Sequence, residues 1–269
     1  NLASETAALK VLEMGGAGHA MHALDFLHYA YLQSGQEDQA HAVMEKVAHA
    51  DWMNSQDRAA NLADLEKRYA LETHDWKQAE ALETPAGAGL RLQGALHWAR
   101  TLADARLGKT AAARKELQGL EAVRLKLAAA HDRYGPDPFG VELQEAAGWV
   151  AQAEGKEQEA ARAMRAAAKE EETRGGPNVL GIPAGELLGD LLLEQGQPGE
   201  ALAAYESALK QSPNRFDSLY GAARAAELAG QKQEARRYYQ QLVNTCAGAS
   251  EGRPELRQAR AYLKSIGMD

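Results

Sequence analysis

Four side chains near the start of the chain are of metal-ligand type and evenly spaced. In the stretch HAMHALDFLHYAY, residues 19–31, the residues His19, His22, Asp25 and His28 follow one another three apart. Imidazole nitrogens and carboxylate oxygens are common ligands of zinc and related metals. In an α-helix, however, each step of three residues turns by about 300°, so His28 lies roughly opposite His19. The four groups cannot converge on one ion, and we expect no bound metal and no cofactor.

A repeated pattern predicts the helices that carry these groups. Residues 182–215 and 216–249 show the same order of apolar residues, glycine and alanine at a period of 34 residues, which is the tetratricopeptide length. In the first unit the pattern is set by Leu188, Gly189, Leu192, Gly196, Ala201, Tyr205, Ala208 and Pro213. Glycine permits the tight turn between two helices, and alanine permits their close crossing. Each unit is therefore predicted to be a pair of antiparallel helices.

The same turn residue and alanine recur upstream, five residues apart. The pairs are Gly35 with Ala40, His74 with Ala79, Gly108 with Ala113, and Gly155 with Ala160. These spacings predict an all-α chain of tetratricopeptide-type helix-turn-helix repeats, stacked as a single right-handed α-solenoid over residues 1–269. The approximate units are 1–20 (partial), 21–56, 57–90, 91–130, 141–175, 182–215 and 216–249, with a capping helix at 253–266. The register of units 57–90 and 91–130 is ambiguous by one residue, so their faces stay unassigned.

Charge and composition narrow the class of partner. The chain has 38 acidic and 30 basic residues, a formal net charge of −8, and no basic stripe, which argues against nucleic acid as a partner. No apolar run is long enough to span a bilayer, so we expect no membrane insertion. The one cysteine, Cys246, excludes an intrachain disulfide framework.

Several stretches resemble long bacterial tetratricopeptide-repeat proteins. The resemblance is clearest in HALDFLHYAYLQSGQ, RYALETHDWKQA, PAGELLGDLLLEQGQPGEALAAYE and PNRFDSLYGAARAAELAGQ. The resemblance implies further repeats before Asn1, so we expect the present chain to be the C-terminal part of a longer array. It fits either a cytoplasmic or an exported, periplasmic protein. It implies no site residues, because we know of none established for this group. A cut N-terminal edge would also allow self-association.

The solenoid predicts a binding scaffold for a protein or peptide, because stacked helix pairs form a concave groove. Positions of the first helices expected to face this groove are His22, Asp25, Tyr29, Glu145, Trp149, Glu186, Asp190, Tyr220 and Arg224. Their acidic excess favours a ligand segment that bears Lys or Arg, with Trp149 as the main aromatic anchor. The alternative is part of a metal-dependent or hydrolytic enzyme whose site would involve His22 and Asp25.

Overall fold

The computed structural model describes residues 17–130, 139–176, 181–249 and 252–267. Every regular element in these ranges is a helix, so the expected all-α fold class is confirmed. The helices are α2 (Ala17–Gln33), α3 (Glu37–Ala48), α4 (Ser55–Glu72), α5 (Trp76–Glu80), α6 (Leu90–Arg106), α7 (Thr110–Ala129), α8 (Gly140–Ala153), α9 (Glu157–Thr173), α10 (Ala184–Glu194), α11 (Pro198–Gln211), α12 (Phe216–Leu228), α13 (Lys232–Thr245) and α14 (Pro254–Ser265).

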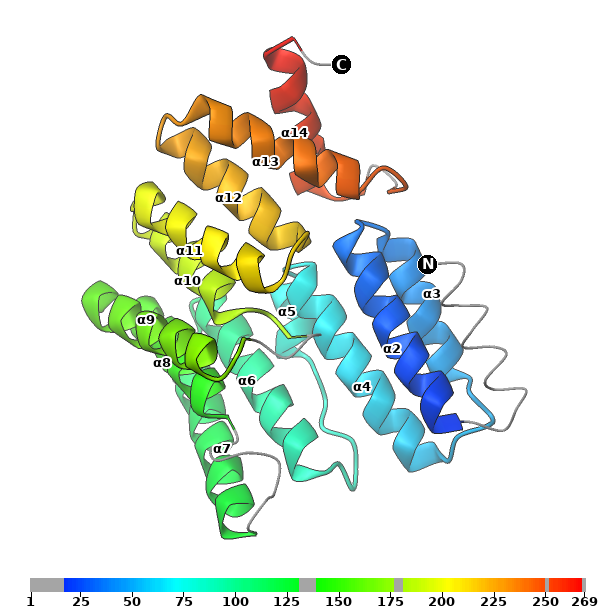
Figure 1. The fold of residues 1–269 in the computed structure, drawn as a ribbon. Helices are drawn as coiled ribbons and strands as arrows, with labels where there is room; N and C mark the ends of the chain where they lie inside the picture. The colour runs from blue at the N-terminus through cyan, green and yellow to red at the C-terminus, as the bar shows by residue number, and fades with distance from the viewer. Residues whose placement is uncertain (1–16, 131–138, 177–180, 250–251, 268–269) are drawn as a thin grey trace.

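Helices α2 to α13 form six hairpins, and α14 covers the end of the last one (Figure 1). Five of the six turns contain a glycine with positive φ, as at Gly196 with φ of 69°. In the second hairpin His74 takes this position with φ of 55°, a conformation that is uncommon for a residue with a side chain. The second helix of that hairpin, α5, is short, because Pro85 and Gly87 follow it closely in the sequence.

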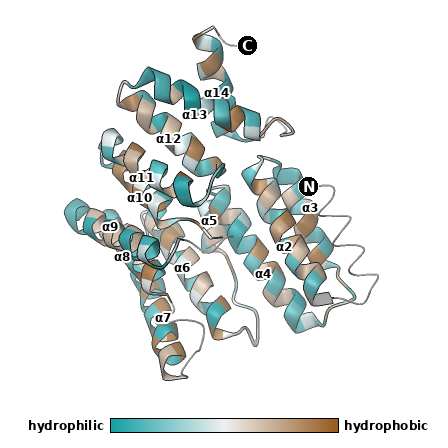
Figure 2. Ribbon diagram, viewed as in Figure 1, coloured by the Kyte–Doolittle hydropathy of each residue, from teal (hydrophilic) through white to brown (hydrophobic). Residues whose placement is uncertain are grey.

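Small side chains fill the crossings between paired helices. The alanine that follows each turn by five residues is completely buried at Ala40, Ala79, Ala113, Ala160, Ala201 and Ala235. The burial expected from the sequence for Ala40, Ala160, Ala201 and Ala235 is therefore confirmed. Apolar residues are concentrated on the faces where helices meet, as Figure 2 shows by hydropathy. Alanine at the crossing lets the two helix axes approach closely, which a larger side chain would prevent.

The hairpin of α10 and α11 packs against α12 through one aromatic residue that needs glycine opposite it. The ring of Tyr205 on α11 lies between Gly189 of α10 and Gly221 of α12. A Cβ atom placed on Gly189 would lie 2.6 Å from the Tyr205 ring, and one on Gly221 would lie 2.3 Å from it. Both distances are too short for any side chain to be accommodated without displacing the ring. Gly189 is thus required by packing within its own hairpin, and Gly221 by packing between repeats.

The array curves so far that its last hairpin returns to its first two (Figure 1). The backbone N–H of Phe216, at the start of α12, donates to the side-chain oxygen of Gln33, at the end of α2, at 2.9 Å. The amide nitrogen of Gln33 donates to Glu72, at the end of α4, at 2.8 Å. Residues 183 positions apart in the chain are therefore in direct contact.

Arg215 is the centre of this long-range contact. Its guanidinium donates two hydrogen bonds to the Glu186 carboxylate, at 2.9 and 2.8 Å, and one to Glu72 at 3.0 Å. All three side chains are almost fully buried. Burial alone would raise the pKa of Glu186, but the charge and hydrogen bonds of Arg215 hold it below its ordinary value. The ion pair of Glu186 is thus internal to the fold.

We expect Ala201→Leu to destabilise the protein by about 1–3 kcal/mol, because the added carbons overpack a closed crossing between α10 and α11. The measurement is urea denaturation, with Ala203→Leu, exposed on the same helix, as the control. An unchanged midpoint for Ala201→Leu would contradict the packing described above.

We expect Arg215→Ala to cost about 3–5 kcal/mol, because it leaves the buried carboxylates of Glu72 and Glu186 without a counter-ion. The control is Arg236→Ala, which removes an exposed guanidinium from α13. Urea denaturation curves of both variants give the free energies. If Arg215→Ala lowered the free energy of unfolding by no more than Arg236→Ala does, the buried ion pairs would not stabilise the fold.

Candidate functional site

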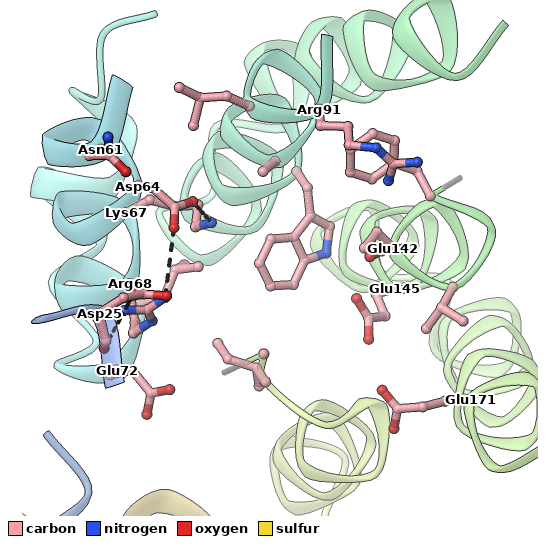
Figure 3. A pocket seen from close by; sticks show the side chains of 18 of the residues that line it. Asp25, Asn61, Asp64, Lys67, Arg68, Glu72, Arg91, Glu142, Glu145 and Glu171 are labelled. Carbon is pink, nitrogen blue, oxygen red and sulfur yellow. Dashed lines mark hydrogen bonds and ion pairs between the residues drawn. The ribbon is translucent and has the colours of Figure 1, made fainter. Parts of the chain in front are cut away.

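A groove with a cavity volume of about 850 Å³ lies on the inner side of the first four hairpins. Helices α2 and α4 form one wall, α6 forms the floor, and α8 and the end of α9 form the other wall (Figure 3). Gly181 and Ile182, which precede α10, complete the lining. The groove therefore depends on elements distributed over more than half of the chain.

The charges of the α2 and α4 wall are neutralised within the protein. Arg68 donates to the Asp25 carboxylate at 2.6 Å and lies 3.6 Å from Asp64. Lys67 pairs with the same Asp64 at 2.5 Å. Burial tends to raise the pKa of Asp64, but Lys67 and Arg68 together lower it. This wall thus already has its own counter-ions.

The structure places the three histidines of the opening stretch apart, as the helical spacing predicts. His19 and His22 are exposed, whereas His28 is completely buried. His28 Nδ1 lies 3.3 Å from the Arg68 guanidinium, and burial followed by the charge of Arg68 lowers its pKa to about 3. His28 is therefore a neutral acceptor that packs under Arg68. Among the described residues, no three His, Cys, Asp or Glu side chains are arranged to hold a metal ion.

The α8 and α9 wall has a different electrostatic character. Glu145 on α8 and Glu171 on α9 are only 2% and 7% exposed, and both line the groove. Burial, reinforced by the neighbouring carboxylates of Glu142 and Glu171, raises the pKa of Glu145 well above its ordinary value. Burial also raises the pKa of Glu171 to about 7, although the carboxylate accepts a hydrogen bond from the backbone N–H of Ala184 at 2.9 Å.

The residues expected to share one concave face are divided among separate environments. His22, Asp25 and Glu145 line the groove. Glu186 belongs to the buried Arg215 network, and the partly buried Tyr29 lies close enough for Arg215 to affect its pKa, which burial raises. The remaining four residues do not line the groove; they are Trp149, Asp190, Tyr220 and Arg224.

Trp149 lies in the core at 3% exposure, with the Arg106 guanidinium 4.5 Å from its ring centre. The anchor role expected for Trp149 would therefore require a rearrangement that opens this packing. Asp190 accepts a hydrogen bond from the Tyr205 hydroxyl at 2.6 Å, and burial raises its pKa to about 6. Tyr220 donates to Gln258 at 2.6 Å.

Arg224 donates to Glu227 at 2.8 Å, on its own helix. Arg224 and Tyr220 therefore each have a hydrogen-bond partner within the protein. Neither residue lines the groove described above.

Sequence reasoning missed the α4 and α6 contributions to the groove. Asp64, Arg68 and Trp98 lie in the two units whose register was ambiguous, so no face could be assigned to them. The spacing of Asp64 and Arg68, four residues apart, was an available signal for an ion pair on one helix face. Glu171 was missed because it lies on the second helix of its hairpin, whereas only first helices were considered.

Comparison with known proteins locates one region of similarity. A family model described as tetratricopeptide repeat matches residues 187–254, which run from α10 to the first residue of α14. No curated protein matches the chain. Among the helices of the described ranges, none combines the length and the apolar character needed to cross a bilayer.

The raised pKa of Glu171 predicts a specific pH dependence of stability. The folded chain holds this proton up to about pH 7, whereas an unfolded chain releases it near pH 4.5. The stabilisation from protonated Glu171 is therefore complete below pH 4.5 and is lost as the pH rises through about 7. Glu171→Gln keeps an acceptor for Ala184 and carries no charge. We expect it to match the parent at pH 4.5 and to exceed the parent's stability above pH 7.

The gain above pH 7 should be about 1–2 kcal/mol, reduced from the full effect by partial solvent exposure. Urea denaturation at several pH values measures it, with the exposed Glu172→Gln on the same helix as the control. A difference between parent and Glu171→Gln that stays constant with pH would contradict the assignment.

Proposed function

We propose that this chain, whose residues 187–254 match a tetratricopeptide-repeat family model, is an interaction scaffold and that its groove binds an extended segment of a partner protein. Tetratricopeptide repeats generally mediate protein interactions through the concave side of the stacked hairpins. In this chain the groove lies on that side, across the first helices of four successive hairpins.

The observation that carries the proposal is the groove itself. Its volume of about 850 Å³ lies within the usual range of ligand-binding clefts, and its lining combines apolar and charged side chains. At its rim, Phe26 on α2 is 38% exposed and packs against the His22 ring with a centroid distance of 4.8 Å. An exposed aromatic pair at the rim of a cleft is a suitable contact for an apolar side chain of a ligand.

The charge of the groove favours a basic segment. Asp25 and Asp64 are paired with Arg68 and Lys67, so the α2 and α4 wall offers little net charge to a ligand. On the opposite wall, burial raises the pKa of both Glu145 and Glu171, and the charge of Glu171 raises the pKa of Glu145 further. A nearby cation would favour the ionised form of both carboxyl groups. A ligand that brings positive charge to this wall is therefore preferred over an acidic one.

No specific observation favours the enzyme alternative. It required Asp25 to act with His22, but the Asp25 carboxylate is held by Arg68 at 2.6 Å. His22 is exposed and its ring packs against Phe26. We therefore do not propose a catalytic function for these residues.

The test is selection of peptides from a random library by the parent, followed by titration of the selected peptides against two matched variants. Ala60→Trp places an indole in the groove from α4, whereas Ala59→Trp places the same group on the exposed side of the same helix. We expect Ala60→Trp to weaken binding about tenfold or more and Ala59→Trp to leave it unchanged. Peptides that bind both variants as tightly as they bind the parent would show that the groove is not the binding site.

A further inference from the structure

We propose that Glu145, Glu171 and Trp98 form a subsite that receives one arginine side chain of the bound segment. The inference rests on the proposed function, since it assigns the residue that the groove selects. Figure 3 shows the carboxyl groups of Glu145 and Glu171 pointing toward the same end of the groove from α8 and α9. A cation bound at that end of the groove would be attracted by both.

Within the described part of the chain, neither carboxyl group forms an ion pair with a basic side chain, although the charge of Arg215 acts on Glu171 from farther away. Glu171 accepts a hydrogen bond only from the neutral backbone of Ala184 among the contacts that the structure describes. The charges that act most strongly on Glu145 are those of Glu142 and Glu171, both acidic. Burial raises the pKa of both carboxyl groups because a buried carboxylate is costly without a counter-ion, so a ligand cation would favour their ionised form.

Trp98 gives the subsite an aromatic surface next to Glu145. It lines the groove from α6, is 8% exposed, and its indole N–H favours the charged form of Glu145. The N–H nevertheless lies outside hydrogen-bond geometry with every acceptor in the described part of the chain. Buried indole N–H groups usually have an acceptor. The indole nitrogen is closed to solvent, so Glu145 rather than a bound peptide is the acceptor within its reach.

The shape of the wall suits arginine better than lysine. A guanidinium presents several N–H donors in one plane, so it can bond to two separate carboxylates and also stack on an indole. Its aliphatic part needs apolar neighbours, and Leu92, Val141 and Ile182 line the same cavity. The ammonium of lysine is a compact charge that would satisfy fewer of these contacts at once.

The opposite wall provides the internal comparison. Asp25 and Asp64 are also acidic and also line the groove, but Arg68 and Lys67 already occupy them. A ligand arginine there would have to displace an existing ion pair. The preference for arginine is therefore assigned to the Glu145 and Glu171 wall alone.

The probes for the test are the peptides selected in the groove assay. In each peptide the arginines are replaced one at a time by citrulline, which keeps the side-chain shape and removes the charge. Calorimetry then gives the affinity of each peptide for the parent, for Glu145→Gln, for Glu171→Gln, and for the exposed control Glu172→Gln. Thermal unfolding confirms that every variant is folded.

We expect one citrulline replacement to weaken binding by about tenfold or more, and Glu145→Gln and Glu171→Gln to weaken the arginine peptide by a similar factor. Glu145→Gln and Glu171→Gln should bind the citrulline peptide no more weakly than the parent does. The control Glu172→Gln should have the affinity of the parent for both peptides. This coupling is the signature of a direct contact.

Two results would overturn the subsite and leave the groove proposal standing. These are selected peptides that depend on the groove but contain no arginine, and citrulline peptides that bind as tightly as the arginine forms. Failure to select any peptide whose binding is weakened by Ala60→Trp would overturn the groove proposal and the subsite together.

Discussion

Arg215 connects parts of the chain that the repeat pattern alone would leave apart. Its guanidinium bridges Glu186, in the adjacent hairpin, and Glu72, at the end of α4 in the second hairpin. Stacking of neighbouring repeats determines only local contacts, and a solenoid can in principle have any curvature that its interfaces allow. The buried ion network selects one curvature, because its charges are stable only when all three groups meet. Gln33 extends the network to α2 and to the start of α12.

The shape of the groove depends on this contact between the two ends of the array. Glu72 and Gly181 both line the groove, and both accept hydrogen bonds from Arg215, at 3.0 Å from Glu72 and 3.2 Å from the Gly181 carbonyl. Just beyond Gly181, the backbone of Ala184 is held by Glu171, so the segment before α10 is fixed from two sides. The network that closes the array therefore also positions the wall where a ligand would bind. The same residues thus stabilise the fold and shape the groove for which we propose a binding role.

The sequence predicted the local packing well and the long-range contacts poorly, for physical reasons. Burial of Ala201 and its equivalents follows from helical periodicity and the need for small residues at crossings, which are local properties. The contact between Arg215 and Glu72 spans 143 positions and depends on the accumulated twist of several repeats, which no local pattern encodes. The same limit explains Glu186, which a repeat template places on the concave face but which the closed array buries. The sequence indicated that a buried His28 would need a partner, but it could not identify Arg68.

The most direct test of this account is a distance distribution between the two regions that the network joins. Spin labels at Ala42→Cys on α3 and Arg236→Cys on α13, both exposed positions, report it by double electron–electron resonance in a Cys246→Ala background. We predict one narrow distribution for the parent and for the exposed control Glu83→Gln. Glu72→Gln, which removes the charge that links Arg215 to α4, should give a broader distribution shifted to longer distances. Superimposable distributions for the parent and Glu72→Gln would contradict the claim that this ion network sets the curvature of the array.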